Sequence, residues 1–201
     1  DVATPEAFAR DPELVWRFYL ARRSGLLAVK PNPAHYALVE LERRCPAFDL
    51  ITQNVDGLHA IAGSRKVIAL HGEIWVDRCT DCGHEERVAT VAAGLPVCSR
   101  CGASARPGIV WFGEMLPPDA IQFAAQAARS ADVFLVIGTS SVVEPAASLA
   151  HLAKDHGATV VEVNMEPTPL TPFADATLLG KAGEIMPQVV AALVNGAAGA
   201  G

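Results

Sequence analysis

The sequence contains 201 residues, of which 51% are hydrophobic and 19% are charged, and its formal net charge is −6 at pH 7. A chain of this length can bury roughly 70% of the surface that it exposes when unfolded, so it can form a core of its own. The acidic balance argues against a general nucleic-acid-binding protein, and the absence of an apolar run of about eighteen residues argues against a membrane span. We therefore expect a globular, monomeric protein that binds neither nucleic acid nor a membrane.

The predicted elements alternate between helical patterns and short apolar strands. A helical segment is expected over about residues 4–45, followed by strands at 48–52, 67–70, 133–137 and 159–163 and helices at 54–62, 117–130, 145–156 and 182–195. Short runs that are apolar on both faces are typical of parallel strands covered by helices. The pattern predicts an α/β fold with a Rossmann-like, doubly wound parallel sheet, formed by residues 1–71 and 109–195. Residues 196–201, rich in alanine and glycine, are expected to form a flexible tail.

Residues 72–108 interrupt this alternation and carry two cysteine pairs, Cys79-x-x-Cys82 and Cys98-x-x-Cys101. Two residues between thiolates let a tight turn direct both sulfurs at one ion, and two such pairs complete a tetrahedral zinc shell. Two redox pairs or two disulfides are the alternatives, but doubled pairs at this spacing in a chain without secretory features favour zinc. A closed shell of four thiolates leaves no position for a substrate, so we expect a structural zinc in a small inserted domain. Cys45 is expected to be an ordinary, half-buried thiol.

Polar residues follow three of the predicted strands. Gln53, Asn54 and Asp56 follow the first, His71 follows the second, and residues 138–140 follow the third. Taken singly, Asn54 could cap the next helix, Asp56 could accept hydrogen bonds from its first turn, and residues 138–140 could be an ordinary turn. Ligands of doubly wound sheets bind beyond the carboxyl ends of the strands, so together these residues predict a nucleotide site.

The polar residues belong to a series of motifs that resembles the sirtuins, from about Thr4 to Pro187. The motifs, in chain order, are Gln53-Asn54-Val55-Asp56-Gly57-Leu58-His59, His71-Gly72, the two cysteine pairs, Val110-Trp111-Phe112-Gly113-Glu114, Gly138-Thr139-Ser140 and Asn164. The resemblance implies an NAD-dependent protein lysine deacylase that consumes NAD as a co-substrate. The implied products are the free lysine, nicotinamide and O-acyl-ADP-ribose.

The resemblance also implies a role for each site residue. His71 would be the general base that acts on the ribose hydroxyls, which suits an imidazole because its ordinary pKa lies near neutral pH. NAD would be bound by Gln53, Asn54, Val55, Asp56, Gly138, Thr139, Ser140, Asn164 and, through its backbone, Ala182. The peptide would add as a strand beside Val110, Trp111, Phe112 and Gly113, with little demand on its sequence. His59 is expected to be structural.

Tyr19 and Arg22 resemble the class III branch, whose members remove succinyl, malonyl and glutaryl groups. Residues three apart share a face of a helix, so a phenol and a guanidinium can hold one carboxylate there. A neutral acetyl group would leave the guanidinium unpaired, so only weak deacetylation is expected. The alternative is an amphipathic helix with Trp16, Phe18 and Tyr19 partly packed and Arg22 and Arg23 in solvent.

One motif of the family, the glycine-rich Gly-Ala-Gly-x-Ser loop with its preceding strand, does not occur in this sequence. Such loops supply backbone donors to a pyrophosphate, so either the chain belongs to a longer parent protein or the chain as written binds NAD poorly. We expect the former, and the predicted function refers to the parent protein. The location is expected to be cytoplasmic, or mitochondrial if the parent carries a targeting signal. An ADP-ribosyltransferase on the same scaffold and an inactive, zinc-containing binding module are the alternative functions.

Overall fold

The computed structural model describes residues 2–91 and 94–198. The chain divides into two compact units, each built from separate stretches of sequence. Unit 1 comprises Asp1–Lys30, Thr52–Gly57 and Ala69–Pro118, and unit 2 comprises Pro31–Ile51, Leu58–Ile68 and Asp119–Gly201. The predicted zinc insertion lies inside unit 1, whereas its boundary with a dinucleotide-binding domain stays a prediction.

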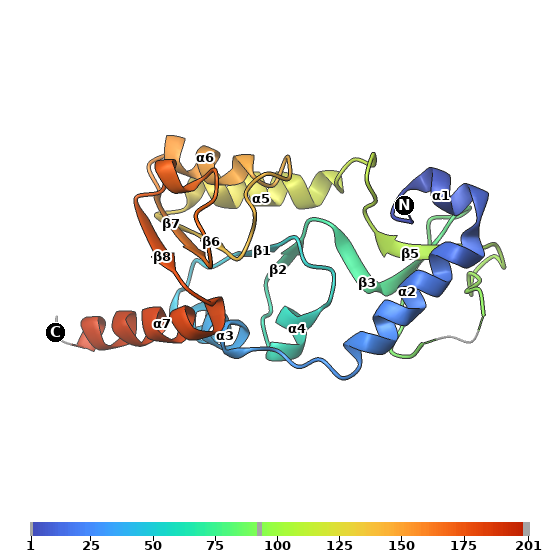
Figure 1. The fold of residues 1–201 in the computed structure, drawn as a ribbon, viewed down its shortest axis with the longest axis horizontal. Helices are drawn as coiled ribbons and strands as arrows, with labels where there is room; N and C mark the ends of the chain where they lie inside the picture. The colour runs from blue at the N-terminus through green and yellow to red at the C-terminus, as the bar shows by residue number, and fades with distance from the viewer. Residues whose placement is uncertain (1, 92–93, 199–201) are drawn as a thin grey trace. The chain divides into compact units, whose positions relative to one another are not determined.

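The elements follow one another as labelled in Figure 1. The helices are α1 (Pro5–Arg10), α2 (Pro12–Leu26), α3 (Pro33–Arg44), α4 (Leu58–Ala62), α5 (Pro118–Ser130), α6 (Ser148–Asp155) and α7 (Ala182–Ala198), with a 3-10 turn at Thr171–Phe173. The strands are β1 (Leu50–Thr52), β2 (Val67–Ala69), β3 (Gly72–Cys79), β4 (Glu85–Arg87), β5 (Ala105–Ile109), β6 (Val133–Ile137), β7 (Thr159–Asn164) and β8 (Ala176–Leu179). None of the helices in the described ranges is both long and apolar enough to cross a membrane.

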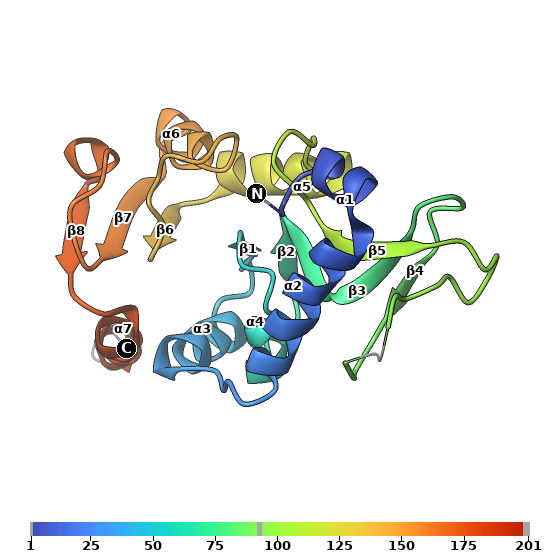
Figure 2. The same ribbon diagram turned by 45° about the vertical axis from the view of Figure 1, so that its right-hand side comes forward.

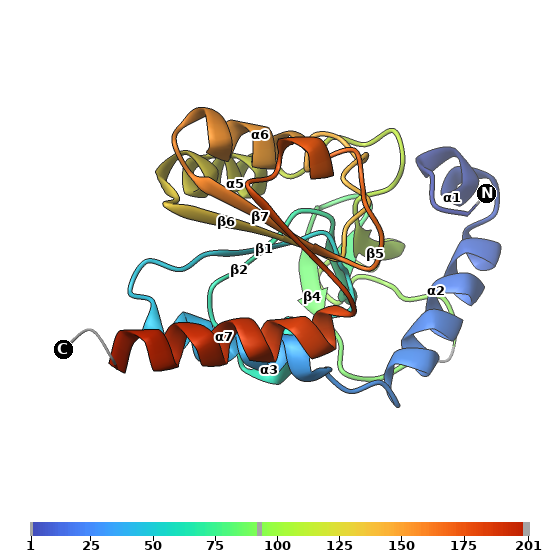
Figure 3. The same ribbon diagram turned by 60° about the vertical axis from the view of Figure 1, so that its left-hand side comes forward.

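Unit 2 is built on a parallel sheet in the order β6-β7-β8. Side chains alternate along β6, so Leu135 and Ile137 pack with α3 and α7, whereas Val136 packs with α6. Figure 3 shows these helices on opposite faces of the sheet. A parallel sheet buried on both faces confirms the predicted α/β class.

Unit 1 is built on an antiparallel sheet in the order β4-β3-β5, with α1 and α2 packed against it (Figure 2). The Asp11 side chain caps α2 by accepting a hydrogen bond from the Leu14 N–H at 2.9 Å. The buried face of α2 carries Trp16, whose indole donates to the Ala105 carbonyl at 2.9 Å. Helix α2 is therefore held to β5 by a buried hydrogen bond as well as by apolar packing.

Two predicted helices begin later than their patterns indicate. The helix predicted at 54–62 begins at Leu58, because the Val55 carbonyl instead accepts the Ile74 N–H at 2.8 Å and Gly57 has a φ of +79°. The helix predicted at 145–156 begins at Ser148, whose N–H and hydroxyl both donate to the Glu144 carboxylate. In both cases contacts outside the helix fix the residues before its first turn.

The end of the chain also differs from prediction. Helix α7 continues to Ala198, so residues 196–198 of the predicted tail are helical, and residues 199–201 lie outside the described residues. Ala197 and Ala198 have the highest helix propensity, which favours continuation of the helix despite the cost of Gly196.

The deepest charge in unit 1 is Arg23, which the amphipathic-helix alternative placed in solvent. It is 0% exposed, donates to the Ile74 carbonyl at 2.7 Å and forms a 2.6 Å ion pair with Asp77. Its guanidinium also lies 5.2 Å from the Trp16 ring and 6.0 Å from the Trp75 ring. The pair joins α2 to β3 in the interior, where either charge alone would be costly.

Replacing Arg23 should therefore destabilise unit 1 strongly. In Arg23→Met the buried Asp77 carboxylate loses its partner, and we expect the free energy of unfolding to fall by about 3–5 kcal/mol. Urea unfolding followed by tryptophan fluorescence measures this, since all three tryptophans lie in unit 1.

The matched control is Arg87→Met, which also lies in unit 1. The Arg87 side chain is 61% exposed, and it pairs with the Glu73 carboxylate. An exposed pair of this kind contributes at most about 1 kcal/mol. Equal losses in the two variants would contradict the structural role of the buried pair.

Candidate active site and metal centre

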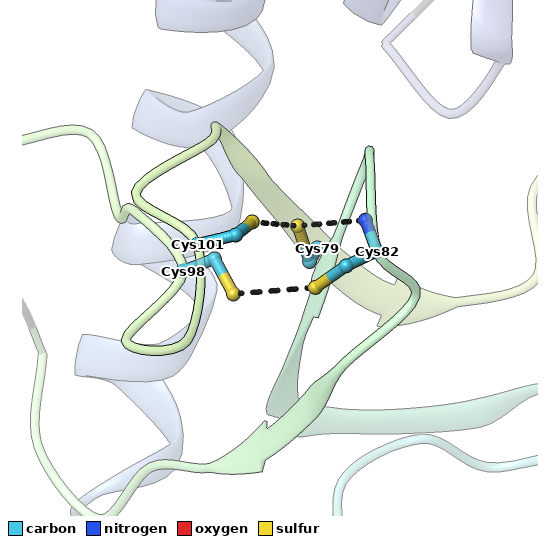
Figure 4. Close-up of side chains that lie close together, drawn as sticks. All are labelled: Cys79, Cys82, Cys98 and Cys101. Atoms are coloured by element: carbon cyan, nitrogen blue, oxygen red, sulfur yellow. Dashed lines mark hydrogen bonds between the residues drawn. The ribbon is translucent and has the colours of Figure 1, made fainter.

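The four predicted metal ligands come together in unit 1. Cys79 ends β3, Cys82 follows it, and Cys98 and Cys101 lie in the segment before β5, as Figure 4 shows. Their sulfur atoms all lie within 4.8 Å of one another, with Cys79–Cys101 at 3.4 Å and Cys82–Cys98 at 3.7 Å. All four cysteines are free thiols, so neither pair is a disulfide.

The arrangement fits zinc. A tetrahedral zinc with bonds of about 2.3 Å to sulfur requires sulfur–sulfur distances of about 3.8 Å, close to those found. The Cys79 sulfur also accepts the N–H groups of Asp81 and Cys82, each at 3.4 Å, and the Cys98 sulfur accepts that of Arg100 at 3.3 Å. These four residues form a closed zinc site that supports the fold of β3 and β5.

Ionisation of the cluster explains why it needs a cation. The backbone N–H of Cys82 lowers the pKa of Cys79 to about 6, so this thiol readily becomes a thiolate. The backbone N–H of Ala103 lowers the pKa of Cys101, but the neighbouring thiols outweigh it and raise that pKa to about 12. Four crowded thiolates are therefore stable together only around a divalent ion.

Loss of one ligand should release the metal. In Cys98→Ser we expect the zinc content to fall from about one ion per chain to well below half an ion per chain. The melting temperature should also fall, because the metal supplies folding free energy. Elemental analysis and thermal unfolding measure the two effects. The control is Cys45→Ser, since the half-buried Cys45 lies in unit 2; zinc loss in this control as well would contradict the assignment.

The predicted base, His71, lies between β2 and β3 in unit 1. Its Nδ1 is 3.1 Å from the Gln53 carbonyl, which can only accept a hydrogen bond. Nδ1 must therefore carry the hydrogen, which leaves Nε2 of the neutral ring as a proton acceptor. The backbone of Gln53 thus orients the imidazole and leaves Nε2 as the acceptor that the predicted role needs.

The glycine after His71 is required by a close approach of two strands. Gly72 has a φ of +74°, and a Cβ there would overlap the Gly108 carbonyl of β5. A Cβ on Gly108 would in turn lie 2.8 Å from the Val76 side chain. The two glycines let β3 and β5 meet next to His71, whose carbonyl accepts the Val110 N–H at 2.9 Å.

The loop after β1 carries the first group of residues predicted to bind NAD. Asn54 is exposed and donates its N–H to the Thr52 hydroxyl at 3.1 Å. The Asp56 carbonyl accepts the Trp75 indole N–H at 3.1 Å. Because α4 begins at Leu58, Asn54 is not the cap of that helix, and the structural alternative for it is wrong.

The residues predicted to contact the acyl group and the peptide meet at Trp111. Trp111 is 3% exposed and donates its indole N–H to the Tyr19 hydroxyl at 2.9 Å. Burial raises the pKa of Tyr19, and the hydrogen bond from Trp111 and the charge of Arg22 oppose this rise. Arg22 is exposed, with its guanidinium 5.7 Å from the Phe18 ring. Tyr19 therefore stays protonated at neutral pH.

The backbone makes a sharp turn at Trp111–Glu114, shortly after β5 ends at Ile109. The Glu114 N–H donates to the Trp111 carbonyl at 3.0 Å across this turn, and Gly113 adopts a φ of +87°. Phe112 is 72% exposed although it is a large apolar residue. The turn therefore presents an apolar side chain next to the buried Trp111.

A second group of predicted residues lies at the carboxyl ends of the strands in unit 2. Thr139, after β6, offers its carbonyl to the Asn164 side chain at the end of β7, at 2.7 Å. Gly138 has a φ of +63° and donates its N–H to the Val163 carbonyl. Ser140 follows, and Ala182 is the first residue of α7, which begins after β8. The edge of the sheet that carries these predicted NAD-binding residues is thus preorganised by backbone and side-chain hydrogen bonds.

The predicted site residues fall into both units. Unit 1 holds Tyr19, Arg22, Gln53, Asn54, Val55, Asp56, His71, Val110, Trp111, Phe112, Gly113 and the four cysteines; unit 2 holds Gly138, Thr139, Ser140, Asn164 and Ala182. Sequence reasoning missed Arg106, which stacks 3.6 Å from the Trp111 ring centroid. No sequence pattern around Arg106 predicts a functional role, because its partners Trp111 and Glu114 lie beyond the end of its strand.

Comparison with known proteins decides the family. The profile of the Sir2 family matches residues 1–145, well over half of the chain. The chain belongs to the Sir2 family.

Sir2 relatives resemble nearly the whole chain. The NAD-dependent protein deacylase 1 of Archaeoglobus fulgidus is 51% identical over 192 residues, which are 94% of this chain and 78% of the relative. The NAD-dependent protein deacylase of Thermus thermophilus is 54% identical over 182 residues, which are 89% of this chain and 72% of the relative.

Solved Sir2 structures share the fold. A Sir2 homologue in complex with NAD is 49% identical with a TM-score of 0.94, covering 97% of this chain and 77% of that chain. A Sir2 protein bound to an acetylated peptide is 35% identical with a TM-score of 0.87, covering 94% of this chain and 81% of that chain. The predicted sirtuin resemblance and fold class are confirmed, whereas the roles of single residues stay predictions.

Proposed function

We propose that the chain is an NAD-dependent protein lysine deacylase that prefers acyl groups ending in a carboxylate, such as succinyl and malonyl. Deacylation that consumes NAD is supported by relatives of that name at about half identity and by neighbours solved with NAD and with an acylated peptide. The acyl preference is supported by one observation in this chain, the buried Tyr19 hydroxyl, which is held by Trp111 and lies on the same helix as Arg22, one turn before it.

The chemistry of deacylation needs a base near neutral pH. His71 supplies it, because its Nδ1 faces the Gln53 carbonyl and its Nε2 is left to accept a proton from a ribose hydroxyl. The acyl oxygen of the modified lysine would first displace nicotinamide from the ribose carbon, and the deprotonated hydroxyl would then attack the acyl carbon. The bond from that carbon to the lysine nitrogen would break as the amine takes up a proton, and water would complete O-acyl-ADP-ribose.

The acyl preference follows from charge. A guanidinium and a phenol O–H form charge-assisted and neutral hydrogen bonds with a carboxylate, and the cation compensates for the desolvated anion. An acetyl group ends in a methyl group, which offers neither an acceptor nor a charge. Arg22 should therefore contribute much more to the removal of acidic groups than to deacetylation.

Loss of the base should remove the activity. We expect His71→Ala in the complete gene product to lower deacylation of a succinyl-lysine peptide by about 10²–10⁴-fold, the range for a general base. Mass spectrometry of O-acyl-ADP-ribose and free lysine measures it. His156→Ala, at an exposed position after α6, is the control; an active His71→Ala enzyme would contradict the proposal.

Loss of the cation should change the preference. We expect Arg22→Met to lower kcat/KM for a succinyl-lysine peptide by about 10–100-fold, the equivalent of one charge-assisted hydrogen bond, and to leave deacetylation within about twofold. Arg17→Met, on the exposed side of the same helix, should change neither. Equal losses on both substrates in Arg22→Met would refute the acyl preference.

A further inference from the structure

We propose that Arg106 is a positioning residue for acyl specificity, which acts through Glu114 and Trp111 on the hydroxyl of Tyr19. The inference rests on the proposed function, because it concerns the same acyl group. All four residues lie in unit 1, on α2, on β5 and in the turn that follows β5.

The first step is the pair between Arg106 and Glu114. The guanidinium donates from Nη1 to Oε1 and from Nη2 to Oε2, the latter at 2.9 Å, and Nη2 also reaches the Ile109 carbonyl at 2.9 Å. The two side chains are 14% and 25% exposed, so water competes little for these bonds. A bidentate pair of this kind fixes the orientation of both planar groups.

The second step is that this ion pair fixes the orientation of Trp111. The Arg106 guanidinium lies 3.6 Å from the centroid of the indole, and the Glu114 carboxylate accepts the Trp111 backbone N–H at 2.8 Å. A guanidinium stacked on an indole face and a charged acceptor on the backbone both resist rotation of the ring. The ring plane of Trp111 is therefore set by the ion pair.

The third step leads from Trp111 to Tyr19. An indole N–H is a donor only, so the Tyr19 oxygen must be the acceptor of their 2.9 Å bond. The phenolic hydrogen is thus directed to another acceptor, and the acyl carboxylate of the proposed substrate is such a group. Burial raises the pKa of Tyr19, which keeps that hydrogen in place at neutral pH.

The pair itself is stable at the pH of the reaction. Burial of Glu114 raises its pKa, but the hydrogen bonds from Arg106 and from the Trp111 backbone outweigh this and lower it below its usual range. The carboxylate is charged above that pKa, so its bonds to Arg106 and to the Trp111 backbone are fully formed at neutral pH.

The specificity effect is separable from a general effect on the fold. A displaced Trp111 turn would weaken binding of any peptide, and would therefore affect succinyl and acetyl substrates alike. A misdirected Tyr19 hydroxyl would affect only the substrate that uses it. The ratio of kcat/KM for succinyl-lysine and acetyl-lysine peptides of one sequence isolates the second effect.

The test uses Arg106→Lys in the complete gene product. Lysine keeps the charge but lacks the planar fork, so we expect the succinyl-to-acetyl ratio to fall about fivefold to tenfold, mainly through a higher KM for the succinyl peptide. Glu114→Gln keeps the size and shape of the side chain but removes its charge, and it should lower the ratio by a similar factor. This second variant tests the inference even if Arg106→Lys folds poorly. Arg87→Lys, whose side chain is 61% exposed and paired with Glu73, should leave the ratio unchanged.

A double-mutant cycle shows whether the effect passes through Tyr19. In a Tyr19→Phe background Arg106→Lys should lower the ratio no further, because the hydroxyl that it positions is absent. An undiminished effect in that background would overturn the inference, as would wild-type ratios in both Arg106→Lys and Glu114→Gln. A wild-type enzyme without a preference for succinyl over acetyl peptide would instead overturn the proposed acyl preference, and this inference with it.

Discussion

The close approach of β3 and β5 is the constraint on which the features of unit 1 depend. Gly72 and Gly108 allow it, because a Cβ on Gly72 would overlap the backbone of the opposite strand. At one end of this pairing lies His71, whose carbonyl accepts the Val110 N–H, and at the other end Cys79 pairs with Ala105. The same two strands therefore place His71, the turn after β5 and the metal ligands.

Two interactions support these strands in addition to their apolar packing. The zinc cluster ties Cys79 at the end of β3 to the segment before β5, and its binding free energy is folding free energy. The pair of Arg23 and Asp77 ties β3 to α2 from the interior. The removal of one partner from a buried pair leaves an uncompensated charge, so this pair makes the position of α2, and with it that of Tyr19, specific.

Local patterns in the sequence predicted some features well and others poorly. The spacing of the cysteines predicted the metal site, because two residues between ligands determine the geometry of the turn. The strand at 133–137 was predicted with its observed bounds, because a run apolar on both faces has few other solutions. The start of the helix predicted at 54–62 was wrong, and so was the alternative that placed Arg23 in solvent. Arg106 was missed. Ile74, Asp77 and Trp111 determine these features through contacts that lie outside any local window of sequence.

Neither of the two units is a contiguous segment of the chain. Each unit is assembled from three stretches of chain, and the backbone passes from one to the other at residues 30/31, 51/52, 57/58, 68/69 and 118/119. No single proteolytic cut can release either unit intact, and neither can be expressed as one contiguous fragment. Domain swapping or recombination between homologous genes would thus have to exchange several segments at once to transfer the metal-bearing half with its partners.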